Sequence, residues 1–259
     1  MEAAFFDLDK TVIAKTSIIA YAPALRKNGY LSLPMAGRTA WGHILFKFFG
    51  ADEETLDKAR KTALRLATGM NQKAMKRLVR DNLTEVIEPI VYDDAIDLIE
   101  EHKLKGHLLV LISASPTEIV EPLAEHLGIN EFIATTPVVD SEGRYTGEVE
   151  FYAAGANKAE AIINLSLEKN ISLQNSWAYS DSSTDLPMLE LVGNPVAVNP
   201  DRELRKQAEE RNWPVLEFVR PIALGDRVPL NRKWIAVTVL TFLLGTGLVK
   251  TIKRLRSTN

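Results

Sequence analysis

The sequence predicts an α/β protein built on a doubly wound parallel sheet, with helices inserted after the first strand and a hydrophobic helix near the C-terminus. Three patterns in the 259 residues predict this fold. From Tyr92 onward, short apolar runs alternate with helix-like segments over roughly 120 residues. Before them, residues 14–87 hold four helix-like segments in succession. Residues 234–249 contain no charged side chain.

The first elements follow from short local patterns. The apolar run at residues 3–6 is too short for a helix and is interpreted as a buried strand. The inserted segments, rich in Ala, Leu, Lys and Arg, are predicted as a bundle of four helices at 17–29, 35–49, 52–68 and 71–87. Their expected start signals are Ser32 or Pro34, Asp52 with Thr55, and Asn71, and their stop signals are Gly50 and Gly69.

After Tyr92 the two periodicities alternate. Helices are predicted at 93–106, 116–128, 157–170 and 184–193, and strands at 107–113, 131–150, 176–181 and 194–199. Turn residues at 141–143 interrupt the second of these strand regions, 131–150. Strands that alternate with helices form a parallel sheet, and residues 3–6 are expected to join it.

The amino-acid composition limits the kinds of metal site and covalent cross-link that the chain can form. Hydrophobic residues make up 46% and charged residues 25%, which is ordinary for a globular protein. The chain has no cysteine, which excludes disulfides and thiolate metal sites. Its four histidines are scattered and show no metal-ligand spacing. A bound metal would therefore have oxygen ligands, which favours Mg²⁺ over Zn²⁺.

The net charge of −3 conceals three blocks of opposite sign. Residues 14–87 carry 13 Lys/Arg against 6 Asp/Glu, residues 88–212 carry 9 against 23, and residues from 213 onward carry 8 against 2. Such blocks indicate separate units with separate partners, although solvated helix faces give the same counts. The basic block lacks the interleaved aromatics of a recognised nucleic-acid-binding module, so no nucleic-acid partner is expected.

Polar residues follow the ends of several predicted strands. Two ionised carboxylates as close as those in "DLD" repel each other, and a metal cation is the usual remedy. Taken singly, each residue also fits a turn, a helix cap or a solvated helix. Ligands of parallel sheets bind at the carboxyl ends of the strands, so a common place at one edge favours a site. The residues in question are Asp7, Asp9, Thr11, Ser113, Lys158, Asp181 and Asp185.

As an ordered set, "DLDKT", "LVLIS", Lys158 and "SDSSTD" resemble the four motifs of the haloacid dehalogenase (HAD) superfamily. The helices inserted after the first motif resemble the cap of its phosphoserine-phosphatase-like branch, subfamily IB. The resemblance covers residues 3 to about 212 and implies a Rossmann-like core. It predicts a core of residues 1–13 and 88–212, a cap of 14–87, a linker of 213–233 and a hydrophobic helix at 234–255.

The resemblance also implies roles for the site residues. Asp7 would be the nucleophile that forms an aspartyl-phosphate, and Asp9 the general acid and base. Thr11, Ser113 and Lys158 would hold the phosphoryl oxygens. Mg²⁺ would be bound by the Asp7 carboxylate, the Asp9 backbone carbonyl and Asp181, with Asp185 in support. The implied activity is that of a Mg²⁺-dependent phosphomonoester phosphatase.

Two features depart from phosphoserine phosphatases. Those enzymes place a glutamate shortly after the first motif to bind the substrate's amino group, whereas this chain has Thr16 nine residues after Asp7. The inserted segment also contains "WGHILFKFFG", which suits either a bundle core or a hydrophobic substrate surface. A lipid-type phosphate and a small metabolite are both open as substrates. The alternatives are a soluble phosphoserine phosphatase, a phosphotransferase and a non-catalytic phosphate-binding module.

The C-terminal region suggests a membrane anchor. A proline-containing linker precedes "WIAVTVLTFLLGTGLV", which would span about 24 Å as a helix against about 30 Å for a hydrocarbon core. Extension to Leu255 with snorkelling lysines would supply the missing length. The start "MEAAFFDLDK" has no basic region typical of a signal peptide, so we expect a cytoplasmic catalytic domain attached to the inner membrane face. A helix that packs on the domain or mediates dimerisation is the alternative.

Overall fold

A computed structural model describes residues 1–30, 64–65 and 67–219 of the chain. All of them belong to one compact unit, Met1–Ile222. The expected helix at 35–49, most of the helix at 52–68 and the hydrophobic segment at 234–255 lie outside the described residues. Within the described part of the chain, no helix is both long and apolar enough to cross a membrane.

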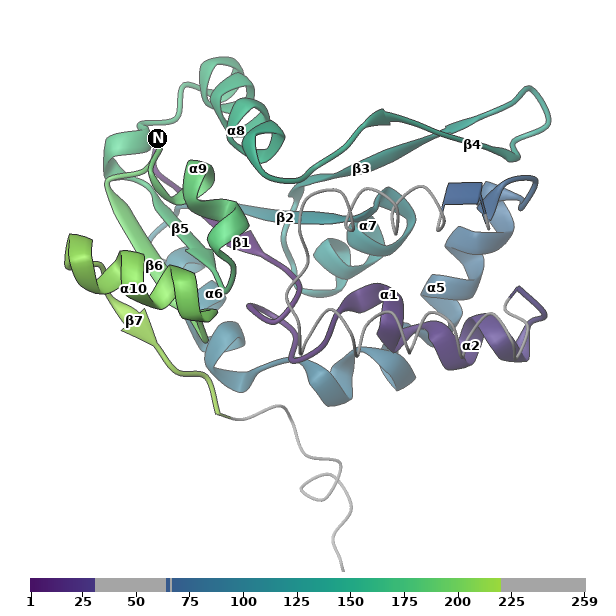
Figure 1. Cartoon of the computed structure of the whole chain (residues 1–259), viewed down its shortest axis with the longest axis horizontal. Helices are drawn as coiled ribbons and strands as arrows, with labels where there is room; N and C mark the ends of the chain where they lie inside the picture. The colour runs from purple at the N-terminus through teal and green to yellow at the C-terminus, as the bar shows by residue number, and fades with distance from the viewer. Residues whose placement is uncertain (31–63, 66, 220–259) are drawn as a thin grey trace, which may run out of the picture. The chain divides into compact units, whose positions relative to one another are not determined.

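A seven-stranded sheet with the order β4-β3-β2-β1-β5-β6-β7 forms the centre of this unit (Figure 1). All neighbouring strands are parallel except β3 and β4, which form an antiparallel hairpin. The strands are β1 (Ala3–Asp7), β2 (Leu108–Pro116), β3 (Glu131–Val139), β4 (Tyr145–Phe151), β5 (Trp177–Ser180), β6 (Asn194–Val198) and β7 (Val215–Leu216). The predicted α/β fold with a parallel sheet is confirmed.

Helices cover both faces of the sheet because the side chains of its central strand alternate. Ala4 and Phe6 of β1 belong to one apolar cluster, and Ala3 and Phe5 to another. The first cluster includes side chains of α6 (Asp93–Leu104) and α7 (Thr117–His126). The second includes side chains of α8 (Ala156–Lys169), α9 (Leu186–Leu189) and α10 (Arg202–Arg211). The sheet is therefore doubly wound, as the alternation of elements predicted.

Several element boundaries differ from the prediction. The expected helix at 17–29 is two short helices, α1 (Ser17–Ala20) and α2 (Ala22–Lys27). The expected helix at 184–193 is a 3-10 turn, Ser183–Asp185, followed by α9. A further 3-10 turn, Glu88–Ile90, precedes α6, and another, Leu173–Asn175, precedes β5.

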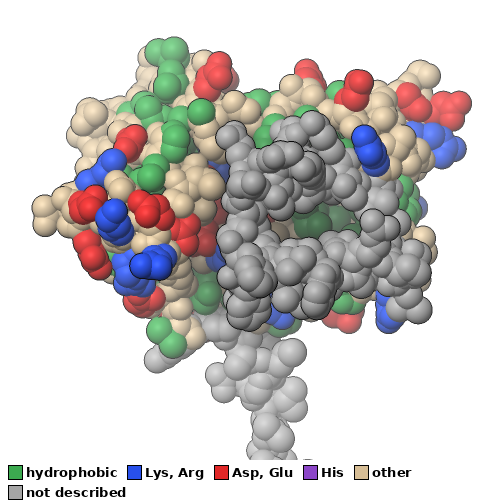
Figure 2. Space-filling model, viewed as in Figure 1, with side chains coloured by type: hydrophobic (Ala, Val, Ile, Leu, Met, Phe, Trp, Pro, Cys, Tyr) green, Lys and Arg blue, Asp and Glu red, His purple; other side chains and the backbone are tan. Residues whose placement is uncertain are grey.

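The C-terminal end of the core was not predicted. Residues 215–216, assigned to a linker from the sequence, pair with β6 and extend the sheet as β7. A strand of two residues is too short for an alternation pattern to be recognised. Helix α10 buries only Leu204 and Ala208, which is too few apolar residues for a clear helical stripe. Its charged side chains make ion pairs on the surface, and Figure 2 shows acidic and basic groups interspersed over this part of the molecule.

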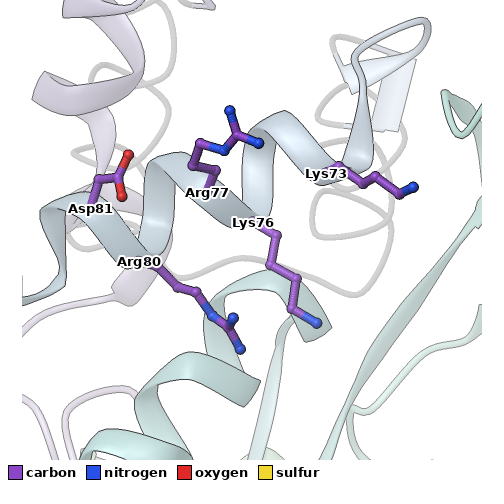
Figure 3. Close-up of a pocket in the computed structure, with 5 residues that line it drawn as sticks. All are labelled: Lys73, Lys76, Arg77, Arg80 and Asp81. Carbon is purple, nitrogen blue, oxygen red and sulfur yellow. The ribbon is translucent and has the colours of Figure 1, made fainter.

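The last helix of the inserted segment, α5 (Gln72–Val86), packs on the core helix α7 through three polar contacts in register. Gln72 donates to Glu118 at 2.8 Å, Lys76 lies 2.5 Å from Glu121, and Arg80 lies 3.0 Å from Glu125. Figure 3 shows Lys76 and Arg80 projecting from α5 toward the neighbouring helix, whereas Lys73 and Arg77 project in other directions. These contacts fix α5 to the element that follows β2.

The hairpin of β3 and β4 also contacts the start of α5. The backbone N–H groups of Gly69 and Gln72 donate to the carbonyls of Tyr145 and Gly143, and the Tyr145 N–H donates to the Met70 carbonyl. Gly147 on β4 has a φ of +90°, and a Cβ there would lie 2.5 Å from the Thr68 hydroxyl. Only glycine fits this close approach without strain. The hairpin and α7 together hold the N-terminal turn of α5.

Candidate active site

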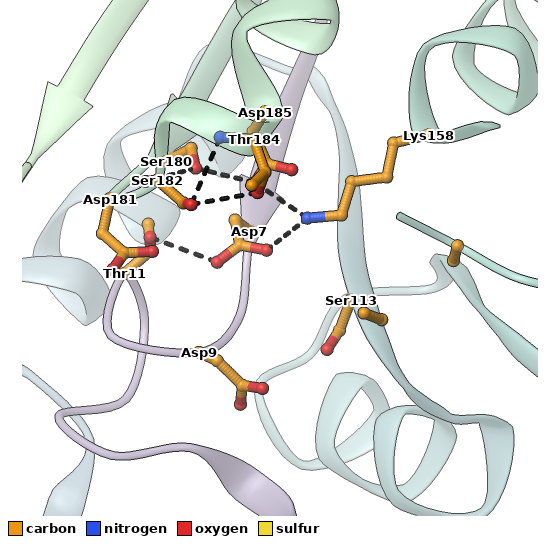
Figure 4. Close-up of polar contacts among 12 residues, drawn as sticks. Asp7, Asp9, Thr11, Ser113, Lys158, Ser180, Asp181, Ser182, Thr184 and Asp185 are labelled. Atoms are coloured by element: carbon orange, nitrogen blue, oxygen red, sulfur yellow. Dashed lines mark hydrogen bonds and ion pairs between the residues drawn. The ribbon is translucent and has the colours of Figure 1, made fainter. Parts of the chain in front are cut away.

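The site lies at the carboxyl edge of the sheet, where the loops after β1, β2 and β5 meet (Figure 4). Asp7 is the last residue of β1 and pairs with Ile112, the residue before Ser113. Ser180 is the last residue of β5, which pairs with β1, so Asp181 follows at the same edge. The strand register thus brings the predicted residues of three distant motifs to one place.

Lys158 connects two of the predicted carboxylates. It lies in the first turn of α8, and its side chain is only 4% exposed. Its Nζ atom donates to Asp7 Oδ1 at 2.6 Å and to Asp185 Oδ2 at 2.8 Å. The Ser180 hydroxyl donates to the same Asp185 oxygen at 2.7 Å. An ammonium group buried here is stabilised because both of its carboxylate partners are within hydrogen-bond distance.

The loop after β1 contributes two further contacts. Lys10 has a φ of +65°, and this turn places the Thr11 hydroxyl 3.3 Å from Asp7 Oδ2 as a donor. The Lys10 ammonium lies 3.5 Å from Asp181 Oδ2. The "DLDKT" loop therefore supplies Asp7 with the Thr11 hydroxyl and Asp181 with the Lys10 ammonium.

Asp9 has different partners from Asp7. The Ser17 backbone N–H donates to Asp9 Oδ1 at 2.7 Å, and the Ser115 hydroxyl lies 3.4 Å from Oδ2. Ser113 lies two residues before Ser115 and is buried. Its hydroxyl oxygen accepts a hydrogen bond from the Ser115 N–H at 3.0 Å. The structure therefore groups Asp7, Thr11, Lys158 and Asp185 by direct hydrogen bonds, while Asp9 bonds to the start of α1 and the end of β2.

Burial dominates the electrostatics of these carboxyls. It raises the pKa of Asp7 well above its usual range, and Asp185 and Asp181 add to the rise while Lys158 opposes it. Burial also raises the pKa of Asp181 to about 6, against the opposing effect of Lys10. Burial alone would lower the pKa of Lys158, but Asp7 and Asp185 raise it, so the lysine stays protonated.

The sequence interpretation missed four residues that shape the site. Ser17, Ser115 and Ser180 bond to the predicted carboxylates, and Asp201 accepts the backbone N–H and the hydroxyl of Ser183. Asp201 also caps α10 by accepting the Leu204 N–H at 2.7 Å. The acidic residue before a helix is a recognisable start signal, so "NPDRELRK" could have revealed Asp201. The serines have no comparable signal.

The predicted Mg²⁺ ligands are suited to that ion by their chemistry. Asp7, Asp181 and Asp185 offer only oxygen atoms as ligands. Asp185 and Asp181 lie close enough to raise the pKa of Asp7, and Asp185 also raises the pKa of Asp181. Within the described residues, no three His, Cys, Asp or Glu side chains gather as a metal centre by themselves. Among the described residues, Lys158 and Lys10 lie within ion-pair distance of these carboxylates. The assignment of metal ligands stays a prediction.

Comparison with known proteins shows which protein family the chain belongs to. The sequence profile of haloacid dehalogenase-like hydrolases matches residues 4–190. The solved structure of a protein of unknown function from Bordetella pertussis Tohama I matches with a TM-score of 0.72 at 28% identity, covering 83% of this chain and 97% of that one. The chain is thus a hydrolase, and it belongs to the haloacid dehalogenase-like family.

Several relatives are named as phosphatases. A probable phosphatase of Mycobacterium tuberculosis is 44% identical over 88% of this chain and 79% of its own length. A phosphoserine phosphatase of the same organism is 31% identical over 83% of this chain and 70% of its length. A histidinol-phosphatase of Neisseria meningitidis is 32% identical over 83% of this chain and 98% of its length. The expectation of a phosphoric monoester hydrolase is confirmed at this level.

Proposed function

We propose that the protein is a Mg²⁺-dependent phosphomonoester phosphatase that acts through an aspartyl-phosphate on Asp7. The observation that carries the proposal is the position of Asp7: a buried carboxylate at the sheet edge, hydrogen-bonded to Lys158 on one oxygen and to Thr11 on the other. A phosphoryl group in transfer carries negative charge spread over its oxygens, and cationic and hydroxyl donors around the nucleophile stabilise this charge.

In the first step, an oxygen of Asp7 forms a bond to phosphorus while the bond from phosphorus to the ester oxygen breaks. Asp9 gives its proton to the departing oxygen, which leaves as an alcohol. Lys158 and Thr11, already bonded to Asp7, donate to the phosphoryl oxygens as the charge moves onto them. Ser113 is the third predicted donor, from the end of β2.

In the second step, Asp9 removes a proton from water, the water oxygen bonds to phosphorus, and the bond to Asp7 breaks to release phosphate. Asp9 alternates between acid and base without an outside proton carrier. Mg²⁺, held by Asp7, the Asp9 carbonyl, Asp181 and Asp185, would offset the negative charge shared by the carboxylates and the phosphoryl group.

The substrate is the open part of this proposal. A phosphoserine phosphatase and a histidinol-phosphatase are equally distant relatives, so relatedness does not name the substrate. Thr16 cannot form an ion pair with an ammonium group, which disfavours phosphoserine. A lipid-type phosphate or another small-metabolite phosphate fits better, and a soluble phosphoserine phosphatase is the alternative.

Attachment to a membrane is the second part of the proposal and depends on the sequence alone. Residues 234–249 are uncharged, Arg232 and Lys233 precede them, and "KTIKRLRSTN" follows. Such a segment is expected to enter a bilayer with anionic lipids, where each nearby cation adds about 1 kcal/mol. The catalytic unit would then lie at the inner face.

The test is a screen of phosphomonoesters, both soluble and detergent-dispersed lipid esters, with Mg²⁺ and with EDTA. Wild-type protein should release phosphate from at least one ester only in the presence of the metal. Asp7→Asn should abolish release, because an amide does not attack phosphorus, while circular dichroism shows an intact fold. Full activity of Asp7→Asn, or of the wild type in EDTA, would sink the mechanism.

A further inference from the structure

Asp9 is held between two serines that come from different parts of the chain. Ser17 opens α1, and Ser115 lies near the end of β2. Their hydroxyl oxygens are 2.7 Å apart, although the residues are separated by 98 positions in sequence. Both side chains are almost fully buried, with exposures of 0% and 2%.

The two oxygens of Asp9 meet different kinds of partner. Oδ1 accepts the Ser17 backbone N–H at 2.7 Å, and a backbone N–H can only donate. Oδ2 faces the Ser115 hydroxyl at 3.4 Å, and a hydroxyl can either donate or accept. The Ser17 side chain also bonds to Asp9. The carboxyl is therefore held on one side by the start of α1 and on the other by the end of β2.

We infer that the Ser17–Ser115 pair positions Asp9. The contact between the two hydroxyls joins the start of α1 to the end of β2 and so holds the Asp9 carboxyl in one orientation for proton transfer. Ser17 and Ser115 are positioning residues, since they act through Asp9. This inference depends on the proposed phosphatase mechanism, in which Asp9 is the acid and the base.

A second consequence concerns the inserted helices. Ser17 is the first residue of α1. The backbone of Ser115 is fixed, because its N–H donates to the Ser113 hydroxyl at 3.0 Å. The hydroxyl pair thus joins the first inserted helix to the strand that carries Ser113. The orientation of the Asp9 carboxyl depends on both sides being in place.

The leaving group of the substrate distinguishes a positioning role from a merely structural one. An ester with a poor leaving group, such as glycerol phosphate, needs the proton from Asp9, whereas 4-nitrophenyl phosphate leaves readily without it. The ratio of kcat/KM for the two esters therefore measures the acid. Hydrolysis of the aspartyl-phosphate is common to both esters and does not enter this ratio.

The experiment compares Ser115→Ala, Ser17→Ala and the double variant with wild type, all as the full chain with Mg²⁺. Ser115→Ala should lower kcat/KM for glycerol phosphate about 10-fold, the order expected for one hydrogen bond to a charged group, and change it less than about 3-fold for 4-nitrophenyl phosphate. The double variant should lose no more than the worse single variant, because the hydroxyls act as a unit. Ser115→Thr, which keeps the hydroxyl, should restore the wild-type ratio.

Ser166→Ala is the matched control, since Ser166 is a buried serine in α8 whose hydroxyl donates to the Ile163 carbonyl. It should leave the ratio unchanged. Equal losses on both esters in Ser115→Ala, or no loss on either, overturn the inference. If Ser115→Ala unfolds, Ser17→Ala and Ser115→Thr carry the test.

Asp9→Asn separates this inference from the proposed function. It should lower kcat/KM for glycerol phosphate by about 10²–10⁴-fold, with a much smaller loss for 4-nitrophenyl phosphate. If Asp9→Asn shows this selectivity and the serine variants do not, the inference alone fails. If Asp9→Asn shows no selectivity, the acid role of Asp9 fails and the inference falls with it.

Discussion

The Nζ atom of Lys158 lies 2.6 Å from Oδ1 of Asp7, and both side chains are buried. The residues are 151 positions apart in sequence, and the sheet topology alone brings them together. Because Asp185 shares the same ammonium group, two carboxylates depend on one cation. Loss of the lysine therefore affects both the charge balance of the site and the stability of the fold.

We predict that Lys158→Met lowers kcat/KM by at least about 10²-fold, because a phosphoryl donor is lost. The variant should also lose stability, up to about 3–5 kcal/mol if both carboxylates stay ionised, since removing one partner leaves buried charges uncompensated. Steady-state kinetics and thermal unfolding check the two effects.

Lys169→Met is the control on the same helix. Lys169 lies 2.7 Å from Glu131 in a partly exposed ion pair at the surface, which contributes little to stability. Its kinetics should match wild type. Near-normal turnover by Lys158→Met would remove the lysine from the mechanism.

Thr16 leads to a prediction about specificity. Wild type should hydrolyse phosphoserine more slowly than its best substrate, because no carboxylate at this position pairs with the ammonium group. Thr16→Glu should raise kcat/KM for phosphoserine relative to 3-phosphonooxypropanoate, which lacks the amino group, by about 5-fold for an ion pair of about 1 kcal/mol.

Lys15→Glu supplies the control, because it places the same side chain at an exposed neighbouring position and changes the net charge by −2, more than the −1 of Thr16→Glu. It should leave the substrate ratio near the wild-type value. A screen that ranks phosphoserine first for wild type would contradict the argument from Thr16.

The sequence predicted where a candidate site residue lies in the fold when that residue follows a strand. Asp7, Ser113 and Asp181 were located because apolar runs reveal strands and the ends of parallel strands share one edge. Lys158 has no such marker, and only its place in an ordered set of motifs singled it out. Their chemical roles stay predictions until the variants are measured.

The sequence could not predict the serines around Asp9. Ser17 looks like any residue that opens a helix, and Ser115 like a residue that precedes one. Their 2.7 Å contact depends on the packing of α1 against the end of β2. Long-range contacts between small polar side chains leave no periodic pattern in the sequence. Strand β7 was missed for the same reason, because a strand of two residues cannot show an alternating pattern.

The C-terminal segment gives the third prediction. All site residues lie in the compact unit that ends at Ile222, so deletion of residues 223–259 should leave hydrolysis of a small chromogenic phosphate intact. The full chain should sediment with vesicles that contain anionic lipid, and the truncated chain should not. Fractionation and activity of the two forms, side by side, check both statements.

Two outcomes would contradict this prediction. A full chain that does not sediment with the vesicles refutes the anchor. A truncated chain that is folded but inactive on the small ester would assign the hydrophobic segment to the catalytic unit.

The fourth prediction concerns His102, a buried histidine of α6. His102 Nε2 lies 2.7 Å from the Tyr179 hydroxyl, and its Nδ1 lies 2.8 Å from His107 Nδ1. The far nitrogen of His107 lies 3.1 Å from Glu2. If His107 donates to Glu2, the His107 Nδ1 accepts from His102 and the His102 Nε2 accepts from Tyr179. Neutral rings satisfy all three contacts, whereas a proton added to His102 Nε2 would displace the hydrogen bond that the Tyr179 hydroxyl donates to it.

Burial, with the charges of His107 and Lys105 adding to it, lowers the pKa of His102 from 6.5 to about 4. In the unfolded chain this ring gains a proton as the pH falls through 6.5, whereas in the folded chain it stays neutral until about 4. The unfolded state therefore binds more protons in this window, and the free energy of unfolding falls as the pH falls. The free energy of unfolding that His102 contributes falls by up to about 3 kcal/mol between pH 6.5 and 4.

Urea unfolding of wild type and His102→Gln should be measured across this range. The difference between their free energies of unfolding should shrink toward low pH, because glutamine does not ionise. A constant difference between wild type and His102→Gln would show that His102 binds its proton equally in both states.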